Sequence, residues 1–557
     1  MDRQEEGRSS GARLRWLTSA FGLTFLFFAG MFLRYQVIGP LQADRFVRPA
    51  FSQRQRSVPV TLARGNILDR HGVPLHYPAW GNALALFPGE VVDASIVERA
   101  LKDITGSDAF TGPAFPSGDD PPVKVARSLS SAQIQQVLSA ANAGGLTVIP
   151  EEVRYGPGSL ACHVVGHIRA NAYMDPRDNV GESGLESAFQ STLAGGSPAW
   201  SGVVVTAEGG DVPGTGIRIA PPVEVPKDLY TTLDASVQRA VEAVLDSRGV
   251  DKGAAIVLDP STSEVLAMAG RPVFDQNRAG EFLSQPDAPF VNRAISAFTP
   301  GSVFKPVIMS LALEKGYVSP DEVFTCTGEV TVGGRKVSCG GAKEGHGSVT
   351  VREALAKSCN STLIQVGLRI PADELVEYAK KCGFGTLTRI PLQDEAAGVL
   401  PSPYAMYAGD VANMCIGQGY IAVTPLQVAA FFSAIAADGA YLRPSLTMEG
   451  GVAAQVRLFS PETAGLLQEA LLMCAVEGTG RLSWVPSYGS AGKTGTAETG
   501  YAAGTTHAWF CGWTPVIAPK YVIVVFVEEG GDGPSVAAPI FREIAARLLD
   551  THASVTP

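Results

Sequence analysis

The sequence TPGSVFK, residues 299–305, places a serine directly after a Pro-Gly turn and a lysine three residues later. An apolar run follows, which predicts a buried helix, and Pro306 argues that this helix begins at or just before Ser302. Residues three apart share one face of a helix, so the Lys305 amine can lie beside the Ser302 hydroxyl. A serine is a weak nucleophile until a base takes its proton, and a desolvated lysine can be that base. The pattern therefore predicts a nucleophile paired with its base.

The S-x-x-K pattern alone is weak evidence, because it recurs by chance. Two later motifs support the prediction that Ser302 and Lys305 are a nucleophile and its base. Ser358-Cys359-Asn360 is an S-x-N and Lys493-Thr494-Gly495 is a K-T-G, and both follow in the order known for serine acyl-transfer sites. We expect the first on a turn between helices at 351–357 and 362–368, although Ser and Asn could equally be plain helix caps. We expect the second on a strand whose glycines let a ligand backbone approach.

The residues around these motifs predict an antiparallel sheet covered by helices. An amphipathic helix at 234–247 is followed by a strand hairpin at 254–258 and 265–268. Three further strands and a last helix are expected at 490–496, 508–513, 521–527 and 538–549. The segment from Ser302 to about Gly478 is mainly helical and is inserted between the second and third strands. The predicted fold class is α+β, with a five-stranded sheet.

The N-terminus predicts a membrane anchor. Residues 16–33 carry no charge and would span about 27 Å as a helix, close to the thickness of the bilayer core. Arginines precede this run, which favours a cytoplasmic N-terminus and places the remainder of the chain outside the cytoplasm. The alternative is a cleaved signal peptide with Ala29-Gly30 as its only small-residue hint. Because Arg34 follows the long run directly, we favour an uncleaved single-pass anchor.

Length, charge and composition narrow the class of protein. The chain has 557 residues, 46% of them hydrophobic, which is enough for two or three domains. Its net charge of -10 and the lack of a basic stripe exclude a nucleic-acid partner. A Gly- and Pro-rich stretch from Leu193 to Asp228 predicts a domain boundary near its end. The expected parts are a cytoplasmic tail at 1–15, an anchor at 16–34, a first domain at 35–226 and a second domain at 227–551.

Other suggestive patterns have simpler explanations. His163 and His167 have the spacing of a metalloprotease helix, but no Glu follows His163 and the intervening residues suit a strand. The stretch Gly181–Glu186 is expected to be a hinge before a helix rather than a carboxylate site. The stretch Ala63–Gly72 predicts a short strand that ends in a turn. No metal or other cofactor is expected in the catalytic site.

Cysteines matter in a chain that lies mainly outside the cytoplasm, where disulfides persist. Cys326 and Cys339 flank a hairpin pattern with Gly-Gly at its turn, so we predict a disulfide between them. A zinc site that uses both and His346 is the less favoured alternative. The remaining six are expected to be buried thiols: Cys162, Cys359, Cys382, Cys415, Cys474 and Cys511.

Together, the motifs resemble those of class B penicillin-binding proteins, which are membrane-anchored peptidoglycan D,D-transpeptidases. The resemblance covers nearly everything from the anchor to the last helix. Besides the three catalytic motifs it includes Ala63–Gly72, Gly181–Glu186, Asp228–Asp234, Asp259–Met268, Gly417–Tyr420, Thr424-Pro425, Gly478–Gly480 and His507–Phe510. It implies one N-terminal transmembrane helix, an elongated pedestal domain for dimerisation or partner docking at 35–226, and a transpeptidase domain of the β-lactamase-like fold at 227–551.

The resemblance also implies a role for each motif residue. Ser302 would attack the penultimate D-Ala carbonyl of a stem peptide, and Lys305 would take the serine proton. Ser358 would pass a proton to the leaving amine while Asn360 holds Lys305 and the substrate amide. Four residues of the last motif would bind the substrate: Lys493, Thr494, Gly495 and Thr496. The backbone N–H groups of Ser302 and Thr496 would form an oxyanion hole.

The partners implied are peptidoglycan stem peptides, β-lactam antibiotics that acylate the same serine, and a SEDS-family glycosyltransferase in the membrane. Such an enzyme would serve cell-wall synthesis in elongation, division or sporulation. A β-lactamase would need neither the anchor nor the large first domain, and a bifunctional class A enzyme would need a glycosyltransferase domain for which there is too little room. A membrane-anchored β-lactam sensor, or a non-catalytic scaffold of the elongation or division machinery, stays open as the alternative.

Overall fold

The computed structural model describes residues 3–41, 55–105, 120–140, 144–169, 179–204, 218–222, 224–340, 342–449, 454–499 and 504–553. The chain divides into two compact units. The first unit comprises Met1–Thr61, Gly81–Glu151 and Ala199–Pro221, and the second comprises Leu62–Trp80, Glu152–Pro198 and Pro222–Pro557. The Gly- and Pro-rich sequence of residues 112–121 predicts a surface loop, and most of this stretch lies outside the described residues.

In its described residues, the first unit contains two small sheets and three helices. One sheet has the order β1-β6-β7 and the other β4-β3-β5. Their strands are β1 (Gln55–Pro59), β3 (Ala79–Leu86), β4 (Val123–Ala126), β5 (Leu146–Val153), β6 (Trp200–Val204) and β7 (Arg218–Ala220). Helices α3 (Ala94–Thr105) and α4 (Ser131–Ser139) bury Val97, Leu101 and Val137 in one core with Leu84 and Leu86 of β3. Ser130 and Gln133 form a capping box that fixes the start of α4.

Helix α1 (Arg3–Leu41) contains the predicted anchor. Its segment Arg15–Gln36 has a mean hydropathy of 1.7 and is the one span in the described part of the chain that is long and apolar enough to cross a membrane. Large apolar side chains along it, such as Phe25 and Leu26, are exposed. The expectation of one apolar N-terminal helix is therefore confirmed.

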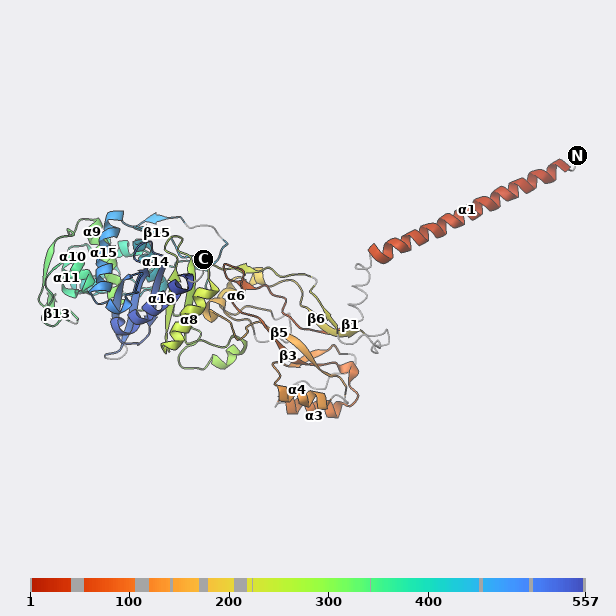
Figure 1. Ribbon diagram of the computed structural model, residues 1–557, viewed down its shortest axis with the longest axis horizontal. Coiled ribbons are helices and arrows are strands. Elements are labelled where there is room, and N and C mark those ends of the chain that lie inside the picture. The colour runs from red at the N-terminus through yellow and green to blue at the C-terminus, as the bar shows by residue number, and fades with distance from the viewer. Residues whose placement is uncertain are drawn as a thin grey trace. The chain divides into compact units, whose positions relative to one another are not determined.

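The second unit is built on a five-stranded antiparallel sheet with the order β10-β9-β19-β18-β17. Figure 1 shows the blue strands of this sheet beside the labels α14 and α16. All five strands lie where the sequence predicted them. They are β9 (Gly253–Leu258), β10 (Val265–Arg271), β17 (Ala491–Glu498), β18 (Thr506–Thr514) and β19 (Tyr521–Val527). The motif strand β17 is at one edge of the sheet and pairs with β18 alone.

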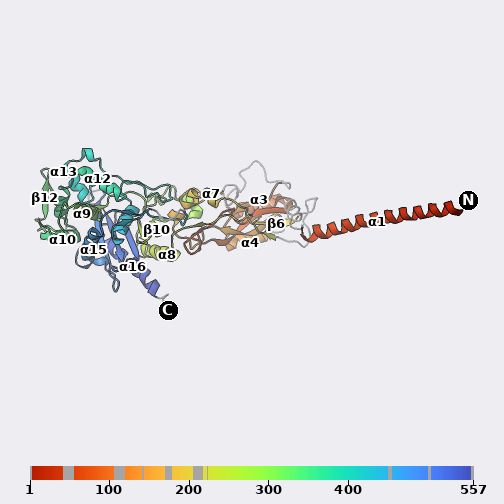
Figure 2. The same ribbon diagram turned by 90° about the horizontal axis from the view of Figure 1, so that it is seen from above.

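Alternate residues of a strand point to opposite faces of the sheet. Since the central strands are apolar at every position, both faces are covered by helices. Val257 and Ile523 are cross-strand partners that pack against α8 (Ala235–Ser247) and α16 (Ala538–Ala553), which lie close together in Figure 2. Their neighbours Ile256 and Val524 point to the opposite core, which contains α9 (Lys305–Glu314) and the buried α14 (Pro425–Ala436). Such a strand, buried on both faces, reads as a continuous apolar run.

The inserted region between β10 and β17 is mainly helical, as predicted, and carries short two-stranded ladders. Its further helices are α10 (Val351–Ala356), α11 (Asn360–Gly367), α12 (Ala372–Lys381), α13 (Ala408–Cys415) and α15 (Pro461–Val476). Its strands are β11 (Val323–Cys326), β12 (Glu329–Val332), β13 (Arg335–Ser338), β14 (Gly347–Thr350), β15 (Ala440–Tyr441) and β16 (Val456–Arg457). Ladders β11–β14 and β12–β13 are both antiparallel.

The segments of the second unit that come early in the chain pack together around buried polar side chains. Strand β2 (Ile67–Leu68) pairs in parallel with β8 (Leu229–Tyr230), and the short helices α5 (Cys162–Val165), α6 (Gly184–Ala188) and α7 (Gln190–Leu193) follow. The expectation of a strand between His163 and His167 is wrong, because α5 occupies that position. His163 Nε2 instead lies 2.8 Å from the Pro289 carbonyl, and His167 Nδ1 lies 2.8 Å from the Ser183 hydroxyl.

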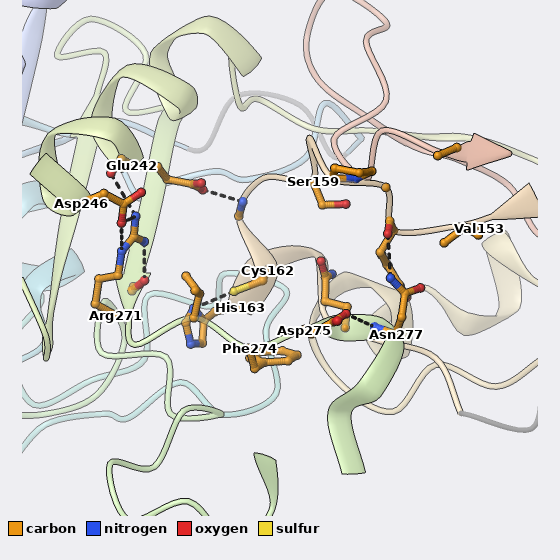
Figure 3. Close-up of a pocket in the computed structure, with 18 residues that line it drawn as sticks. Val153, Ser159, Cys162, His163, Glu242, Asp246, Arg271, Phe274, Asp275 and Asn277 are labelled. Atoms are coloured by element: carbon orange, nitrogen blue, oxygen red, sulfur yellow. Dashed lines mark hydrogen bonds and ion pairs between the residues drawn. The ribbon is translucent and has the colours of Figure 1, made fainter. Parts of the chain in front are cut away.

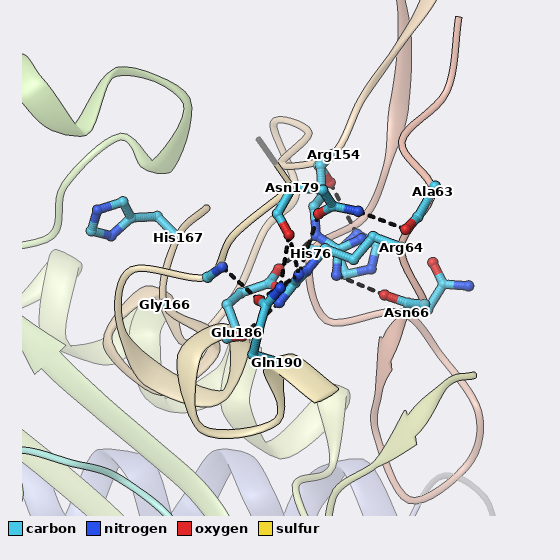
Figure 4. Close-up of polar contacts among 12 residues, drawn as sticks. Ala63, Arg64, Asn66, His76, Arg154, Gly166, His167, Asn179, Glu186 and Gln190 are labelled. Atoms are coloured by element: carbon cyan, nitrogen blue, oxygen red, sulfur yellow. Dashed lines mark hydrogen bonds and ion pairs between the residues drawn. The ribbon is translucent and has the colours of Figure 1, made fainter. Parts of the chain in front are cut away.

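A buried ion cluster connects three of these early segments (Figure 4). The carboxylate of Glu186 accepts from Arg64 Nε at 2.5 Å and from Arg154 Nε at 2.5 Å, and all three side chains are buried. Burial alone would raise the pKa of Glu186, but the two guanidinium groups hold this pKa below its usual range. The helix expected within Gly181–Glu186 is confirmed, because α6 begins at Gly184.

Candidate active site

The predicted nucleophile lies in a 3-10 turn, Gly301–Phe304, which leads directly into α9. The Lys305 backbone N–H donates to the Ser302 carbonyl, so the α-helix begins at Lys305 and not at Ser302 as expected. Pro306 then stands in the first turn of α9, where a missing N–H costs little. Ser302 is half-buried, whereas the Lys305 side chain is fully buried.

The serine turn packs tightly on the motif strand β17. Gly301 has φ +57°, and a Cβ at this position would lie 2.7 Å from the Thr496 carbonyl oxygen. A Cβ on Gly495 would lie 2.9 Å from the Pro300 carbonyl oxygen. Glycine is therefore required at both positions, at Gly301 also because of its left-handed backbone. The approach brings S-x-x-K and K-T-G together although they are almost two hundred residues apart.

The S-x-N motif holds the lysine amine. Lys305 Nζ donates to Asn360 Oδ1 at 2.6 Å, to the Ser358 carbonyl at 2.7 Å and to Ser358 Oγ at 3.1 Å. Ser358 has φ +57°, a left-handed conformation that is rare outside glycine and that is often found at functional sites. The helix-cap alternative is wrong for both residues, because Cys359 is the N-cap of α11 and Asn360 is its first residue.

Burial lowers the pKa of both motif lysines. Removal from water, followed by repulsion from the Lys493 charge, lowers the pKa of Lys305 to about 7. Burial likewise lowers the pKa of Lys493 to about 8. At neutral pH a large share of Lys305 is therefore an unprotonated amine that can accept a proton, while Lys493 is mostly a cation that can attract a carboxylate.

Residues beyond the predicted set complete the site. Thr479 Oγ1 lies 2.7 Å from Thr494 Oγ1, so the G-T-G stretch fixes the hydroxyl of the K-T-G motif. The Gly417 carbonyl accepts from the Gly301 N–H at 2.9 Å and anchors the serine turn. Asn360 Nδ2 donates to the Ser338 carbonyl at 3.0 Å, which turns its oxygen toward Lys305. Motif resemblance singled out the stretches that hold Thr479 and Gly417, but no contact could be assigned from the sequence.

A cavity of about 560 Å³ lies in the second unit, and none of its described lining residues belongs to the three motifs (Figure 3). Two of its charged groups form an ion pair, and Glu242 accepts from a backbone N–H. Arg271 Nε donates to Asp246 Oδ1 at 2.8 Å, and Glu242 Oε1 accepts from the Ala161 N–H at 2.7 Å. Cys162 Sγ lies 3.5 Å from His163 Nδ1 on the cavity wall.

The predicted disulfide between Cys326 and Cys339 is wrong. All eight cysteines lie in the described part of the chain, and all are free thiols. Cys359 is buried, as expected, and its sulfur lies 3.7 Å from that of Cys339. The hairpin β12–β13 does form between the two predicted partners, but their sulfurs do not bond.

Family models match two parts of the chain. Residues 253–546 match the penicillin-binding protein transpeptidase domain, and residues 59–215 match the penicillin-binding protein dimerisation domain. Among curated relatives, the peptidoglycan D,D-transpeptidase MrdA of Salmonella typhimurium is 26% identical over 98% of this chain and 97% of its own length. Stage V sporulation protein D of Bacillus subtilis is 28% identical over 88% of this chain and 78% of its own. The peptidoglycan D,D-transpeptidase PbpA of Mycolicibacterium smegmatis is 32% identical over 57% and 72%.

Solved structures agree with these matches. A structure described as coordinating polymerization and crosslinking in a peptidoglycan synthase complex aligns with a TM-score of 0.69 and 30% identity, and covers 96% of this chain and 98% of its own. Penicillin-binding protein 3 of Mycobacterium tuberculosis with aztreonam aligns with a TM-score of 0.62 and 26% identity over 89% and 97%. With a transpeptidase domain over more than half its length, a dimerisation domain before it and relatives of the same build, this chain belongs to the class B penicillin-binding proteins.

Proposed function

We propose that this chain is a peptidoglycan D,D-transpeptidase that cross-links stem peptides through an acyl-enzyme on Ser302. The observation that carries the proposal is the position of Lys305. Its amine is fully buried, bonded to Ser358 and Asn360, and attached to the same short turn as the serine. Names of relatives that cover nearly the whole chain support the same reaction and substrate class.

In the first half-reaction the Lys305 amine takes the proton of Ser302 as Oγ attacks the carbonyl carbon of the penultimate D-Ala. The peptide C–N bond then breaks, and Ser358 relays the proton to the departing amine of the terminal D-Ala. In the second half-reaction the amine of a neighbouring stem attacks the ester and releases Ser302. A buried lysine with a pKa of about 7 suits both directions of this proton transfer.

Strand β17 is the proposed platform for the stem peptide. It forms the edge of the sheet, so its outer backbone groups can pair with an extended peptide. Lys493 and Thr494 would bind the terminal carboxylate, beside Gly495, where the missing side chain leaves room. The N–H groups of Ser302 and Thr496 would stabilise the oxyanion, and loss of one such donor costs roughly 3 kcal/mol in related enzymes.

The setting of the reaction is part of the proposal. We infer that α1 anchors the chain with its N-terminus in the cytoplasm, because arginines precede the apolar span. Residues 35–226 would form the pedestal that docks a SEDS-family glycosyltransferase, and residues 227–551 the transpeptidase. Ser302 would also be the target of β-lactams, as the aztreonam complex of a relative suggests.

Labelling with a fluorescent penicillin tests the proposal. The full-length protein in detergent should form a long-lived adduct and release D-Ala from a pentapeptide stem. Ser302→Ala should lose both, whereas Ser296→Ala, a half-buried serine in the preceding loop, should keep both. Rapid turnover of the label would indicate a β-lactamase. A stable adduct without D-Ala release would indicate a sensor, and no adduct at all would indicate a scaffold.

A further inference from the structure

Four potential metal ligands meet beside the S-x-N motif. Cys326 ends β11, Cys339 follows β13, His346 precedes β14, and Cys359 is the N-cap of α11. Their ligand atoms all lie within 4.8 Å of one another, and the three cysteines are buried. Four separate segments of the inserted region therefore direct one donor atom each to a single point.

The spacing of these atoms fits a tetrahedral metal site. Zinc lies about 2.3 Å from a thiolate sulfur and about 2.0–2.1 Å from an imidazole nitrogen, which gives tetrahedral edges of roughly 3.8 Å between sulfurs and 3.6 Å between sulfur and nitrogen. Cys339 Sγ lies 3.7 Å from Cys359 Sγ. His346 Nδ1 lies 3.5 Å from the sulfurs of both Cys326 and Cys339. A disulfide would need sulfurs about 2.05 Å apart and would leave two donors unused.

The surroundings of the sulfurs suit thiolates. The Asn360 backbone N–H donates to Cys339 Sγ at 3.2 Å, and the Thr362 N–H donates to Cys359 Sγ at 3.4 Å. Hydrogen bonds of this kind from an outer shell orient metal ligands and stabilise their charge.

We propose that Cys326, Cys339, His346 and Cys359 bind one structural Zn²⁺ that holds the S-x-N motif in place. Binding would deprotonate three thiols, release three protons and leave a site of net charge -1, with neutral imidazole as the fourth ligand. With four protein ligands and no open position, the ion would have a structural role.

The position of the site indicates what the ion would hold. Cys359 is the middle residue of S-x-N, so a metal bond to it restrains Ser358 and Asn360 on either side. Asn360 is tied a second time to the same region through the Ser338 carbonyl, next to Cys339. Ladders of only two strands, such as β11–β14 and β12–β13, are marginally stable by themselves. A metal that joins these ladders to α11 would fix Ser358 and Asn360, the two residues that bind the Lys305 amine. Both residues would thereby position the proposed base.

Metal analysis of the full-length protein in detergent tests the binding site without reference to catalysis. We expect about one zinc per chain after dialysis, with loss in both Cys339→Ser and His346→Ala. Cys162→Ser is the matched control, because its sulfur also lies 3.5 Å from a histidine Nδ1 but has no metal cluster around it among the described residues. Cobalt in place of zinc should give the intense visible absorption of a tetrahedral thiolate site.

Alkylation and peptide mapping under non-reducing conditions keep the test decisive if the variants do not fold. In the wild-type protein the three cysteines should resist alkylation until zinc is removed. A disulfide between Cys326 and Cys339, or free and reactive thiols without metal, would overturn the site.

The inference that zinc positions Ser358 and Asn360 rests on the proposed function. It is tested separately, by the rate of penicillin acylation. Removal of zinc should slow penicillin acylation at least about tenfold, while the melting curve still shows a folded protein. Zinc that is bound but can be removed without any change in acylation would overturn this role and leave the binding site intact. Failure of Ser302 to acylate at all, with zinc still bound, would overturn the proposed function instead.

Discussion

Acylation of Ser302 by a β-lactam should rise about fivefold between about pH 6 and pH 8, because a roughly tenfold gain in neutral Lys305 is halved by the loss of the proton from Lys493. The reason is the Lys305 amine, which can accept the serine proton only when it is neutral. Burial, followed by the charge of Lys493, lowers its pKa from 10.5 to about 7. For a pKa of about 7 the neutral fraction is roughly 9% at pH 6 and roughly 91% at pH 8. With the ordinary pKa of 10.5 it would be only about 0.03% at pH 7.

The acylation rate should fall again at alkaline pH, because a second group loses its proton there. Lys493, with a pKa of about 8, must keep its proton to attract the carboxylate of the substrate or the β-lactam. The second-order rate constant should therefore pass through a maximum between about pH 7 and pH 8. Replacement Lys493→Gln should move the acidic limb to higher pH, because the repulsion that lowers the pKa of Lys305 is lost.

Stopped-flow acylation with a chromogenic cephalosporin across this pH range is the assay. A rate that is flat from about pH 6 to pH 8 would refute the role of Lys305 as the base. A rate that keeps rising tenfold per pH unit beyond about pH 9 would show that its pKa is not lowered.

Two further predictions, each with a control variant, concern the frame around the site. Glu186→Gln should lower the free energy of unfolding by about 3–5 kcal/mol in a urea titration, because it leaves two buried guanidinium groups without their carboxylate. Glu182→Gln, at an exposed pair, should cost less than about 1 kcal/mol, and equal costs would contradict the argument. Gly495→Ala should slow acylation at least tenfold, since its Cβ would press on the Pro300 carbonyl of the serine turn. Gly465→Ala, in open space on α15, should leave the rate unchanged, and an equal loss in both variants would count against this reasoning.

Much of the catalytic unit could be read from local patterns. Short apolar runs predict all five strands of the sheet, and an amphipathic pattern predicts the helix that the structure starts at Ala235, after the N-cap Asp234. The order of the three motifs was enough to propose the site. Local propensity did not predict the 3-10 turn before Lys305, which forms because Gly301 takes a left-handed conformation against β17.

The features that were missed depend on contacts between distant segments. Arg64 and Glu186 are 122 residues apart, and nothing near either residue indicates that they pair. The sequence indicates that Cys359 is buried but not that it lies beside Cys339, which comes from another segment, and the hairpin alone wrongly predicts a disulfide. The strand expected between His163 and His167 failed for a different reason, since four residues are too few for β-branched side chains to decide between strand and helix. Domain division at residue 226 stays a prediction.

The most direct test of the account is peptide mapping of the full-length protein after reaction with penicillin. One stable adduct per chain, located on the peptide that contains Ser302 and absent from Ser302→Ala, is the predicted result. An adduct on any other residue, or D-Ala release that persists in Ser302→Ala, would contradict the claim that this serine and its buried lysine perform the acyl transfer.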